Sequence, residues 1–344
     1  MFVTEKELSP AMLDKNENPF SLPPSSREEL RELVSRLDIN RYPDPTYGEL
    51  RQALGEVYGI PPENIVVGNG GDEILWLLVI AFTKPGDTVV YPHPSFSQYA
   101  HLQKVFHLRE RTFGFTLGKD GFAPREEECL RILREEDPAL VLLDSPNNPT
   151  GTVFDPEFLI KAGFSTKAPF LVDEAYVDFH SSSMMDLWKP GVLPKNMLFL
   201  RTLSKAWGMA GLRLGFAVGE VEMVDTLNRI RSPYNVNVFT QQAATLLIRH
   251  REWVEGRILT LQYTRNAFIA EANRLARWQA FKSCGNFVLL KTEHDEDVLQ
   301  KAFSEARVQV RSLENLPWEG TWVRVTVGTE EDMQRVLESM KSLE

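Results

Sequence analysis

Arg201-Thr202-Leu203-Ser204-Lys205, with Gly211-Leu212-Arg213 shortly after it, carries the chemistry from which the rest of this chain can be interpreted. A lysine amine attacks an aldehyde only when it is deprotonated, so a catalytic lysine requires neighbours that lower its pKa. The two hydroxyls around the lysine and the guanidinium of Arg213 are suitable donors to a phosphate. The segment therefore predicts that Lys205 holds a cofactor with an aldehyde at one end and a phosphate at the other.

Two further polar segments follow apolar runs that indicate buried strands. Asp144-Ser145-Pro146-Asn147-Asn148-Pro149-Thr150-Gly151 follows residues 139–143, and Asp173-Glu174-Ala175-Tyr176 follows residues 169–172. Parallel α/β sheets place their active sites at the carboxyl ends of strands. We therefore expect both segments to contribute to the same site as Lys205.

Pyridoxal phosphate is the cofactor that these groups fit. A carboxylate beside its pyridine nitrogen keeps that nitrogen protonated, and the protonated ring is the electron sink for a carbanion next to the substrate nitrogen. Asp173 is the candidate for this carboxylate, and Asn148 and Tyr176 are candidate donors to the phenolic oxygen of the ring. The simpler alternatives are a helix cap for Asp173 and a packed aromatic ring for Tyr176.

The same motifs resemble those of the fold-type I, pyridoxal-phosphate-dependent aminotransferases, in particular the histidinol-phosphate aminotransferases of the class-II family. The likeness extends over nearly the whole chain. It runs through Asn16-Glu17-Asn18-Pro19, Arg41-Tyr42-Pro43, Gly70-Gly71-Asp72-Glu73, residues 145–151, residues 173–176, residues 202–205 and Val323-Arg324-Val325-Thr326-Val327-Gly328.

The resemblance implies an aminotransferase with Lys205, Asp173 and Tyr176 as catalytic residues. The implied reaction transfers the amino group of L-histidinol phosphate to 2-oxoglutarate, which gives imidazole acetol phosphate and L-glutamate in L-histidine biosynthesis. The alternatives are another amino-acid aminotransferase, for example of the aromatic type, and a lyase similar to phosphothreonine decarboxylase. Those decarboxylases typically differ around the lysine and the final arginine strand, where this chain follows the aminotransferase pattern.

The resemblance also assigns binding residues. The implied cofactor-binding residues are Gly71, Asp72, Phe96, Asn148, Asp173, Tyr176, Thr202, Ser204, Lys205 and Arg213, together with Tyr42 of a neighbouring subunit in a homodimer. The implied substrate-binding residues are Arg324, Arg311 and Tyr234. Planar guanidinium groups suit both a substrate phosphate and the carboxylate of glutamate. An ordinary salt bridge is the alternative for each arginine.

The glycine cluster Gly68-Asn69-Gly70-Gly71 offers a rival hypothesis, because strand, glycine turn and helix also begin a dinucleotide site. Glu73 and Ile74 stand where the third small residue of that pattern belongs. The helix N-terminus after the cluster still offers unpaired N–H groups to an anion. We therefore expect a phosphate near Gly71 and Asp72, and we expect that of pyridoxal phosphate.

Composition limits the possible partners. The chain has 344 residues, 43% of them hydrophobic, and a formal net charge of -10, so no basic surface suggests nucleic acid or an anionic membrane as a partner. Two cysteines are too few for a disulfide framework, which favours a cytoplasmic location. The six histidines form no spaced metal pair, so no metal is expected. Small molecules and a second copy of the chain are the expected partners.

Strands are expected near residues 64–67, 88–91, 140–143, 170–172, 197–200 and 214–218, in alternation with helical stretches. This alternation predicts an α/β fold with a large, mostly parallel sheet flanked by helices. Beyond about Gln241, long helical stretches to about Arg274, then strands at 287–290, 308–311 and 322–327 with a helix between them and a last helix, predict a smaller α+β domain. The expected boundaries are 41–240 for the large, cofactor-binding domain and 1–40 plus 241–344 for the small one, to which the resemblance adds the N-terminal residues.

One departure from the family concerns the N-terminal arm. Family members usually have a longer arm with a tyrosine that closes over the substrate, whereas residues 1–15 here contain no tyrosine. Substrate capture at this edge is therefore in question.

Two hypotheses from other classes are a regulator that binds the cofactor without catalysis and a chain with a vestigial lysine site. A regulator of the first kind usually carries a DNA-binding helix-turn-helix, and this chain offers no basic segment or spare length for one.

Overall fold

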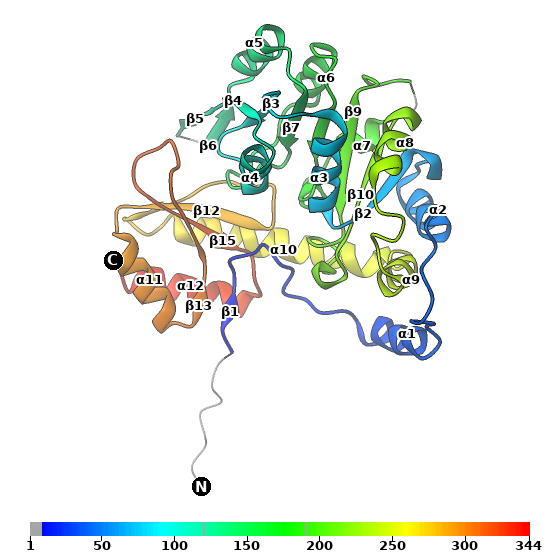
Figure 1. Ribbon diagram of the computed structural model, residues 1–344. Coiled ribbons are helices and arrows are strands. Elements are labelled where there is room, and N and C mark those ends of the chain that lie inside the picture. The colour runs from blue at the N-terminus through cyan, green and yellow to red at the C-terminus, as the bar shows by residue number, and fades with distance from the viewer. Residues whose placement is uncertain (1–8, 120, 190) are drawn as a thin grey trace.

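A seven-stranded sheet forms the centre of the computed structural model, which describes residues 9–119, 121–189 and 191–344 (Figure 1). Its strand order is β2 (Ile65–Asn69), β10 (Leu214–Gly219), β9 (Met197–Thr202), β8 (Phe170–Asp173), β7 (Leu140–Asp144), β3 (Thr88–Pro92) and β4 (Arg109–Phe113). The strands from β9 to β4 pair in parallel, and only β10 is antiparallel to its two neighbours. The predicted mostly parallel α/β sheet is confirmed.

The sheet is buried on both faces, which explains why its strands are continuous apolar runs. Successive side chains of a strand point to opposite faces. Val141 and Leu143 of β7 accordingly belong to one hydrophobic cluster, whereas Leu140 and Leu142 belong to another. Burial on both faces is the usual state of a parallel sheet in an α/β protein.

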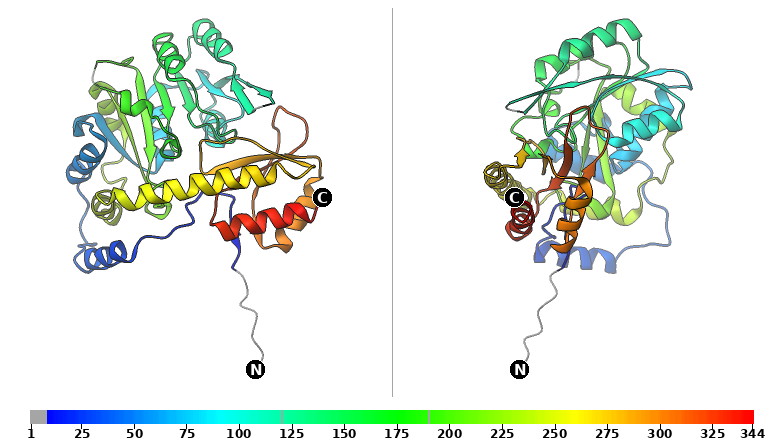
Figure 2. Two further views of the ribbon diagram at one scale, coloured as in Figure 1. Left: turned by 180° about the vertical axis from the view of Figure 1, so that it is seen from behind. Right: turned by 90° about the vertical axis from the view of Figure 1, so that its left-hand side faces the viewer.

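Helices cover both faces of this sheet (Figures 1 and 2). The cluster that contains Leu140 also contains residues of α3 (Gly71–Phe82), α4 (Ser97–Val105) and α8 (Val221–Ile230). The opposite cluster takes in α2 (Gly48–Tyr58), α5 (Glu126–Glu136), α6 (Pro156–Phe164) and the short α7 (Met184–Leu187). In the part of the chain that the structure describes, three 3-10 turns are formed, η1 (Pro62–Asn64), η2 (Val177–Phe179) and η3 (Ala210–Leu212). Among the described residues, no helix has the length and apolar character needed to cross a membrane.

A four-stranded sheet forms the smaller α+β part. Its order is β11 (Trp278–Ala280), β12 (Phe287–Thr292), β15 (Thr321–Thr326) and β14 (Arg311–Leu313), all antiparallel. Its helices are α11 (Glu296–Glu305) and α12 (Glu330–Lys341), and α12 packs against α10 (Arg251–Ala272). α10 follows α9 (Val238–Leu247) and runs beneath both sheets in Figure 2.

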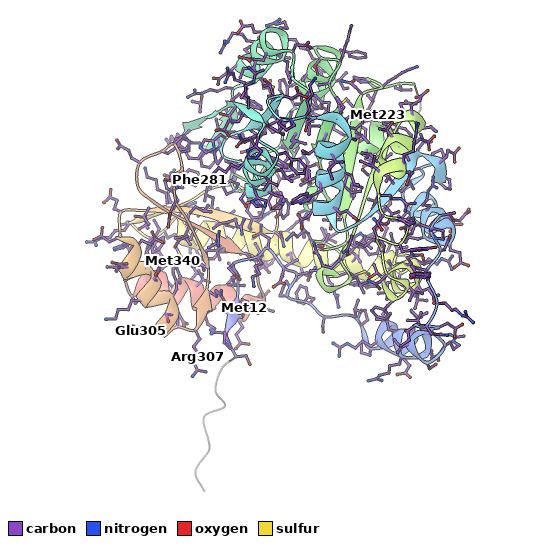
Figure 3. The ribbon with its side chains drawn as sticks, viewed as in Figure 1. Met12, Met223, Phe281, Glu305, Arg307 and Met340 are labelled. Atoms are coloured by element: carbon purple, nitrogen blue, oxygen red, sulfur yellow. The ribbon has the colours of Figure 1, made fainter. Side chains whose placement is uncertain are left out.

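The N-terminal segment joins the two parts of the molecule. β1 (Ala11–Met12) pairs in parallel with β13 (Val308–Gln309), and Met12 lies near Arg307 in Figure 3, whereas Met223 of α8 lies among the helices of the large sheet. The chain then passes the edge of the large sheet to reach α1 (Pro24–Ser35), which contacts α9. This course agrees with an N-terminal segment that belongs to the small part, and the boundaries 41–240 and 1–40 plus 241–344 stay a proposal.

Three local features differ from the sequence prediction. The strand expected at 308–311 is divided between β13 and β14, which pair in different sheets. β4 was missed because it is a charged edge strand with little apolar pattern, as edge strands commonly are. The hairpin of β5 (Phe115–Gly118) and β6 (Gly121–Pro124) was also missed, since both strands are short and only partly buried.

Gly215 of β10 is required by close packing against the start of α3. A Cβ at this position would lie 2.5 Å from the backbone N of Gly71. We expect Gly215→Ala to lower the free energy of unfolding by about 1–3 kcal/mol, the usual cost of overpacking a core. Gly211→Ala is the matched control, because a Cβ there meets nothing within 4 Å. Equal urea midpoints for both variants would contradict this account of the packing.

Candidate active site

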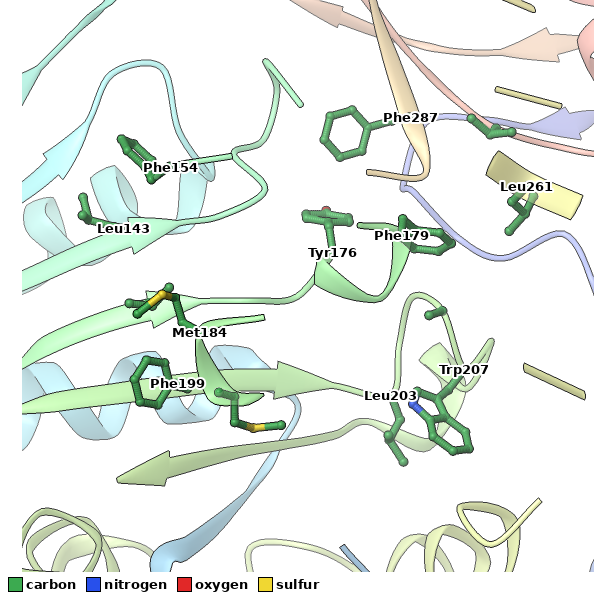
Figure 4. Packing of buried hydrophobic residues seen from close by; sticks show 14 of the residues in the cluster. Leu143, Phe154, Tyr176, Phe179, Met184, Phe199, Leu203, Trp207, Leu261 and Phe287 are labelled. Carbon is green, nitrogen blue, oxygen red and sulfur yellow. The ribbon is translucent and has the colours of Figure 1, made fainter. Parts of the chain in front are cut away.

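The carboxyl ends of β7, β8 and β9 bring the three predicted motifs to one pocket, as parallel pairing requires. The pocket is lined by Gly71, Asp72, Leu75, Phe96, Asp144, Asp173, Ala175, Tyr176, Leu200, Thr202, Ser204, Lys205 and Arg213. Figure 4 shows Tyr176 beside Phe287, at the level where the strands end. Nine of the predicted site residues therefore meet in one place, and Asn148 lies next to them through its contact with Tyr176.

Lys205 follows β9 on a tightly packed turn. Leu203 and Ala206 on either side of it are fully buried, and the amide of Leu203 donates to the carbonyl of Leu214. Because its neighbours fix the backbone, the lysine side chain is directed toward the pocket. The Nζ atom donates to the carbonyl of Lys15 at 2.9 Å and lies 5.7 Å from the ring centre of Tyr176.

One end of the pocket is built to hold an anion. α3 begins at Gly71, and the free N–H groups of a helix N-terminus attract negative charge. Arg213 lies beside it, paired with Asp72 at 3.1 Å, and its guanidinium comes so close to Gly70 that a Cβ there would lie 2.6 Å from Nη2. The hydroxyls of Thr202 and Ser204, 2.9 Å apart, complete the donors at this end.

Asp173 also lines the pocket and is buried at the end of β8. Its carboxylate accepts hydrogen bonds from the hydroxyl of Tyr99 at 3.0 Å and from the amide of Ala175 at 3.0 Å. Burial raises the pKa of Asp173 to about 6, although these two hydrogen bonds act in the opposite direction. Tyr99 was not predicted as a site residue, because its position within an ordinary helical pattern gives no sign of a polar contact.

The hydroxyl of Tyr176 is oriented by two amides. Asn16 Nδ2 donates to it at 2.9 Å, and Asn148 Nδ2 lies at 3.5 Å. Since these amides occupy the acceptor side of the hydroxyl, its own proton is free to point into the pocket. Asn16 is fixed in turn by Thr326 of β15, whose hydroxyl accepts the backbone N–H of Asn16 at 2.9 Å. Asn16 stands within a family motif, but nothing in that motif indicates that its side chain contacts Tyr176.

Arg324 of β15 is the cation between the two sheets. It donates to the side-chain oxygen of Asn148 at 2.7 Å and to the carbonyl of Asp14 at 2.6 Å, while its buried Nε has no partner among the described residues. Burial lowers the pKa of Arg324, and Arg311 adds to this effect. Arg311 lies directly opposite it on β14. Like charges in such a cross-strand pair are destabilising unless an anion joins them.

Tyr42 and Tyr234 are brought together away from the pocket. Their rings stack with centres 4.6 Å apart, and their exposed fractions are 81% and 42%. Neither lines the pocket of its own chain, so a role of Tyr42 at the cofactor of a neighbouring subunit and a role of Tyr234 toward the substrate stay predictions. Among the described residues, no group of three histidine, cysteine, aspartate or glutamate side chains is placed to bind a metal ion.

Comparisons with known proteins find relatives that match nearly the whole chain. A histidinol-phosphate aminotransferase of Caldanaerobacter subterraneus subsp. tengcongensis is 35% identical over 332 residues, which cover 96% of this chain and 92% of the relative. One from Thermococcus gammatolerans is 35% identical over 96% of this chain and 91% of its own length.

Solved structures share the fold. The histidinol-phosphate aminotransferase of Sinorhizobium meliloti, in complex with pyridoxal 5'-phosphate, superposes with a TM-score of 0.85 at 22% identity and covers 97% of this chain and 92% of that one. The L-threonine-O-3-phosphate decarboxylase of Porphyromonas gingivalis has a TM-score of 0.80 at 21% identity, with 97% and 99% covered. Likeness at these identities establishes the fold alone.

The model of the family "Aminotransferase class I and II" matches residues 11–340. This match includes the lysine turn, the buried carboxylate at the end of β8 and the arginine strand of the smaller sheet. The chain therefore belongs to the class I and II aminotransferases.

Proposed function

We propose that this aminotransferase transfers the amino group of L-histidinol phosphate to 2-oxoglutarate in L-histidine biosynthesis. Relatives at about 35% identity over nearly the whole chain are histidinol-phosphate aminotransferases. The observation that carries the substrate assignment is the pair of arginines, Arg324 and Arg311, opposite each other on β15 and β14. A dianionic phosphate relieves the repulsion between the two guanidinium groups.

Pyridoxal 5'-phosphate is the cofactor, and the residues of the pocket fit it. When bound, it supplies an aldehyde for the lysine and a protonated ring that withdraws electrons from the substrate carbon. Thr202, Ser204, Arg213 and the N-terminus of α3 are placed to hold its phosphate. Asp173 is a buried carboxylate that accepts hydrogen bonds from two neutral donors, so a protonated ring nitrogen would satisfy its charge.

The protein side chains divide the chemical work among them. Lys205 Nζ, as the neutral amine, is the base that would take the proton from the substrate carbon and hold it for return. The hydroxyl of Tyr176, oriented by Asn16, donates into the pocket toward the phenolic oxygen of the ring. Asn148 donates from its amide nitrogen to the Tyr176 hydroxyl and accepts from Arg324 with its amide oxygen. It therefore connects the arginine proposed to bind the substrate to the residues at the edge of the cofactor.

Glutamate uses the same cations in the second half of the reaction. Its side-chain carboxylate is an anion that planar guanidinium groups bind as well as they bind phosphate.

We further propose a homodimer in the cytoplasm. The exposed stacked pair of Tyr42 and Tyr234 supports the dimer, since large exposed aromatic groups are enriched at interfaces.

The proposed function is tested by mixing cofactor-loaded protein with L-histidinol phosphate in the absence of a keto acid. We expect the visible absorbance of the bound cofactor to bleach within a single turnover and to return with 2-oxoglutarate. Bleaching only with aromatic amino acids would instead indicate an aminotransferase of the aromatic type. Release of carbon dioxide from phosphothreonine would favour the lyase. Lys205→Ala is expected to abolish both half reactions, whereas the exposed Lys104→Ala keeps them.

The arginine pair predicts a defect in substrate binding. Arg311→Gln removes one charge-assisted contact, so we expect the KM for histidinol phosphate to rise about ten-fold or more, while kcat changes little. Steady-state kinetics with histidinol phosphate as the varied substrate measure this. Arg277→Gln is the control, an exposed arginine of the same part of the chain, and it is expected to behave as wild type. An unchanged KM in Arg311→Gln would remove Arg311 from the binding site.

The raised pKa of Asp173 predicts how stability depends on pH. The pKa of Asp173 is about 6 in the folded, cofactor-free protein, against an ordinary value of 3.8. Between these values the folded state binds more protons than the unfolded state, so this group lowers stability as pH rises through that window. We expect Asp173→Asn to stabilise the cofactor-free protein relative to wild type, and more at pH 7.5 than at pH about 4.5. Thermal melts at the two pH values measure the difference, and a difference that shrinks at high pH would contradict the assignment.

A further inference from the structure

A second buried carboxylate, Asp144, lines the cofactor pocket, and neither the mechanism nor the family resemblance gives it a role. It ends β7 and lies in register with Asp173 of β8, so both side chains emerge on the same face of the sheet. Asp144 is 2% exposed. A carboxylate is rarely buried so deeply unless its oxygens have firm partners.

The partners of Asp144 come from two separate segments. Its Oδ2 accepts the backbone amide of Asn148 at 2.9 Å and the backbone amide of Phe96 at 3.2 Å. Its Oδ1 accepts the side-chain amide of Asn147 at 2.9 Å, and the same amide donates to the carbonyl of Pro94 at 3.1 Å. One carboxylate thus ties the turn at Pro94 to Phe96 to the loop that begins after β7.

These two segments carry groups that the cofactor needs on different sides. Phe96 lines the pocket at the N-terminus of α4, where it is expected to stack on the ring, and Asn148 reaches Tyr176 and Arg324 at the ring's edge. The side chain of Phe96 has no hydrogen-bonding group, so it cannot be bonded directly to that of Asn148. Their relative position therefore depends on what holds their backbones, and Asp144 holds both.

The electrostatics of Asp144 agree with a carboxylate held by its donors. All three donors are neutral N–H groups, and the charged neighbour that faces it is the carboxylate of Asp173. Burial, with help from Asp173, raises the pKa of Asp144 to about 7, whereas the amides of Asn147 and Asn148 act to lower it. The hydrogen bonds from Asn147 and Asn148 favour the ionised form, which can accept from all three donors, whereas burial and Asp173 favour the protonated form.

We infer that Asp144 is a positioning residue that clamps Phe96 and Asn148 at a fixed separation around the cofactor ring. This inference rests on the proposed cofactor site and is independent of the amino donor. Loss of the carboxylate leaves a donor with no acceptor, since an asparagine at 144 has one oxygen for three N–H groups and brings its own NH2 toward one of them. The ring is then less firmly held, although Lys205 and the phosphate end of the pocket are unchanged.

The test compares Asp144→Asn with wild type in cofactor binding. We expect the dissociation constant of pyridoxal phosphate, measured by equilibrium dialysis, to rise about ten-fold or more, as for the loss of a hydrogen bond to a charged group. We also expect a weaker visible circular dichroism signal per bound cofactor, because that signal depends on a fixed ring orientation. Lack of cofactor binding by wild type would overturn the cofactor site itself, whereas normal binding by wild type and variant alike would overturn only the clamp.

Asp155→Asn is the matched control. Asp155 also accepts two backbone amides, those of Glu157 and Phe158, but it does so on the surface at the start of α6. It is expected to bind cofactor as wild type, with the same dichroism. Thermal melts of the cofactor-free proteins separate a general loss of stability from loss of the clamp. Asp144→Ser, with a smaller side chain and one acceptor, is expected to show the same loss of dichroism, and a wild-type signal from a folded Asp144→Ser protein would also overturn the clamp.

Discussion

The parallel pairing of β7, β8 and β9 is the constraint on which the site depends. Parallel strands end at one edge of a sheet, and the register places Asp144 beside Asp173, and Asp173 beside Leu200, two residues before Thr202. Segments separated by about thirty residues in sequence thereby deliver the loop of Asn148, the carboxylate of Asp173 and the turn of Lys205 to one pocket. The helices matter to the chemistry mainly because they keep this edge of the sheet in place.

The two neighbouring buried carboxylates at the end of β8, Asp173 and Glu174, have different kinds of partners. Glu174, the residue after Asp173, points away from the pocket and lies 3.5 Å from Arg201, which also pairs with Asp178. Ser183 donates a further hydrogen bond to Glu174 at 2.6 Å. That carboxylate is thus neutralised within the protein, whereas Asp173 accepts only neutral donors. An unpaired buried carboxylate costs stability, which is the usual consequence of a site that is completed by its ligand.

The N-terminal segment connects the small sheet to the pocket. Asn16 contacts Thr326 of β15 and Tyr176 beside the pocket, and Asn286 donates to its carbonyl at 3.0 Å. Arg324, two residues before Thr326, binds the carbonyl of Asp14. Arg324, the proposed substrate-binding cation, and Asn16, which orients Tyr176, therefore belong to one buried hydrogen-bonded network, in which each polar group needs its partner.

Local signals in the chain were enough to predict the α/β class, the cofactor and the meeting of Lys205 with Asp173 in one pocket. The reason is that buried parallel strands are apolar runs and the cofactor's reactive groups demand particular side chains in short motifs. They could not predict Tyr99, since nothing in an ordinary helix shows that its hydroxyl meets Asp173 seventy-four residues later. They also missed β4, whose charged residues hide an edge strand, and could not show that Arg311 lies opposite Arg324, because β14 and β13 separate within what looked like one strand. Residue type and short spacing follow from the chain itself, whereas strand register and the pairing of distant polar groups arise only when the folded core brings those residues together and excludes water from them.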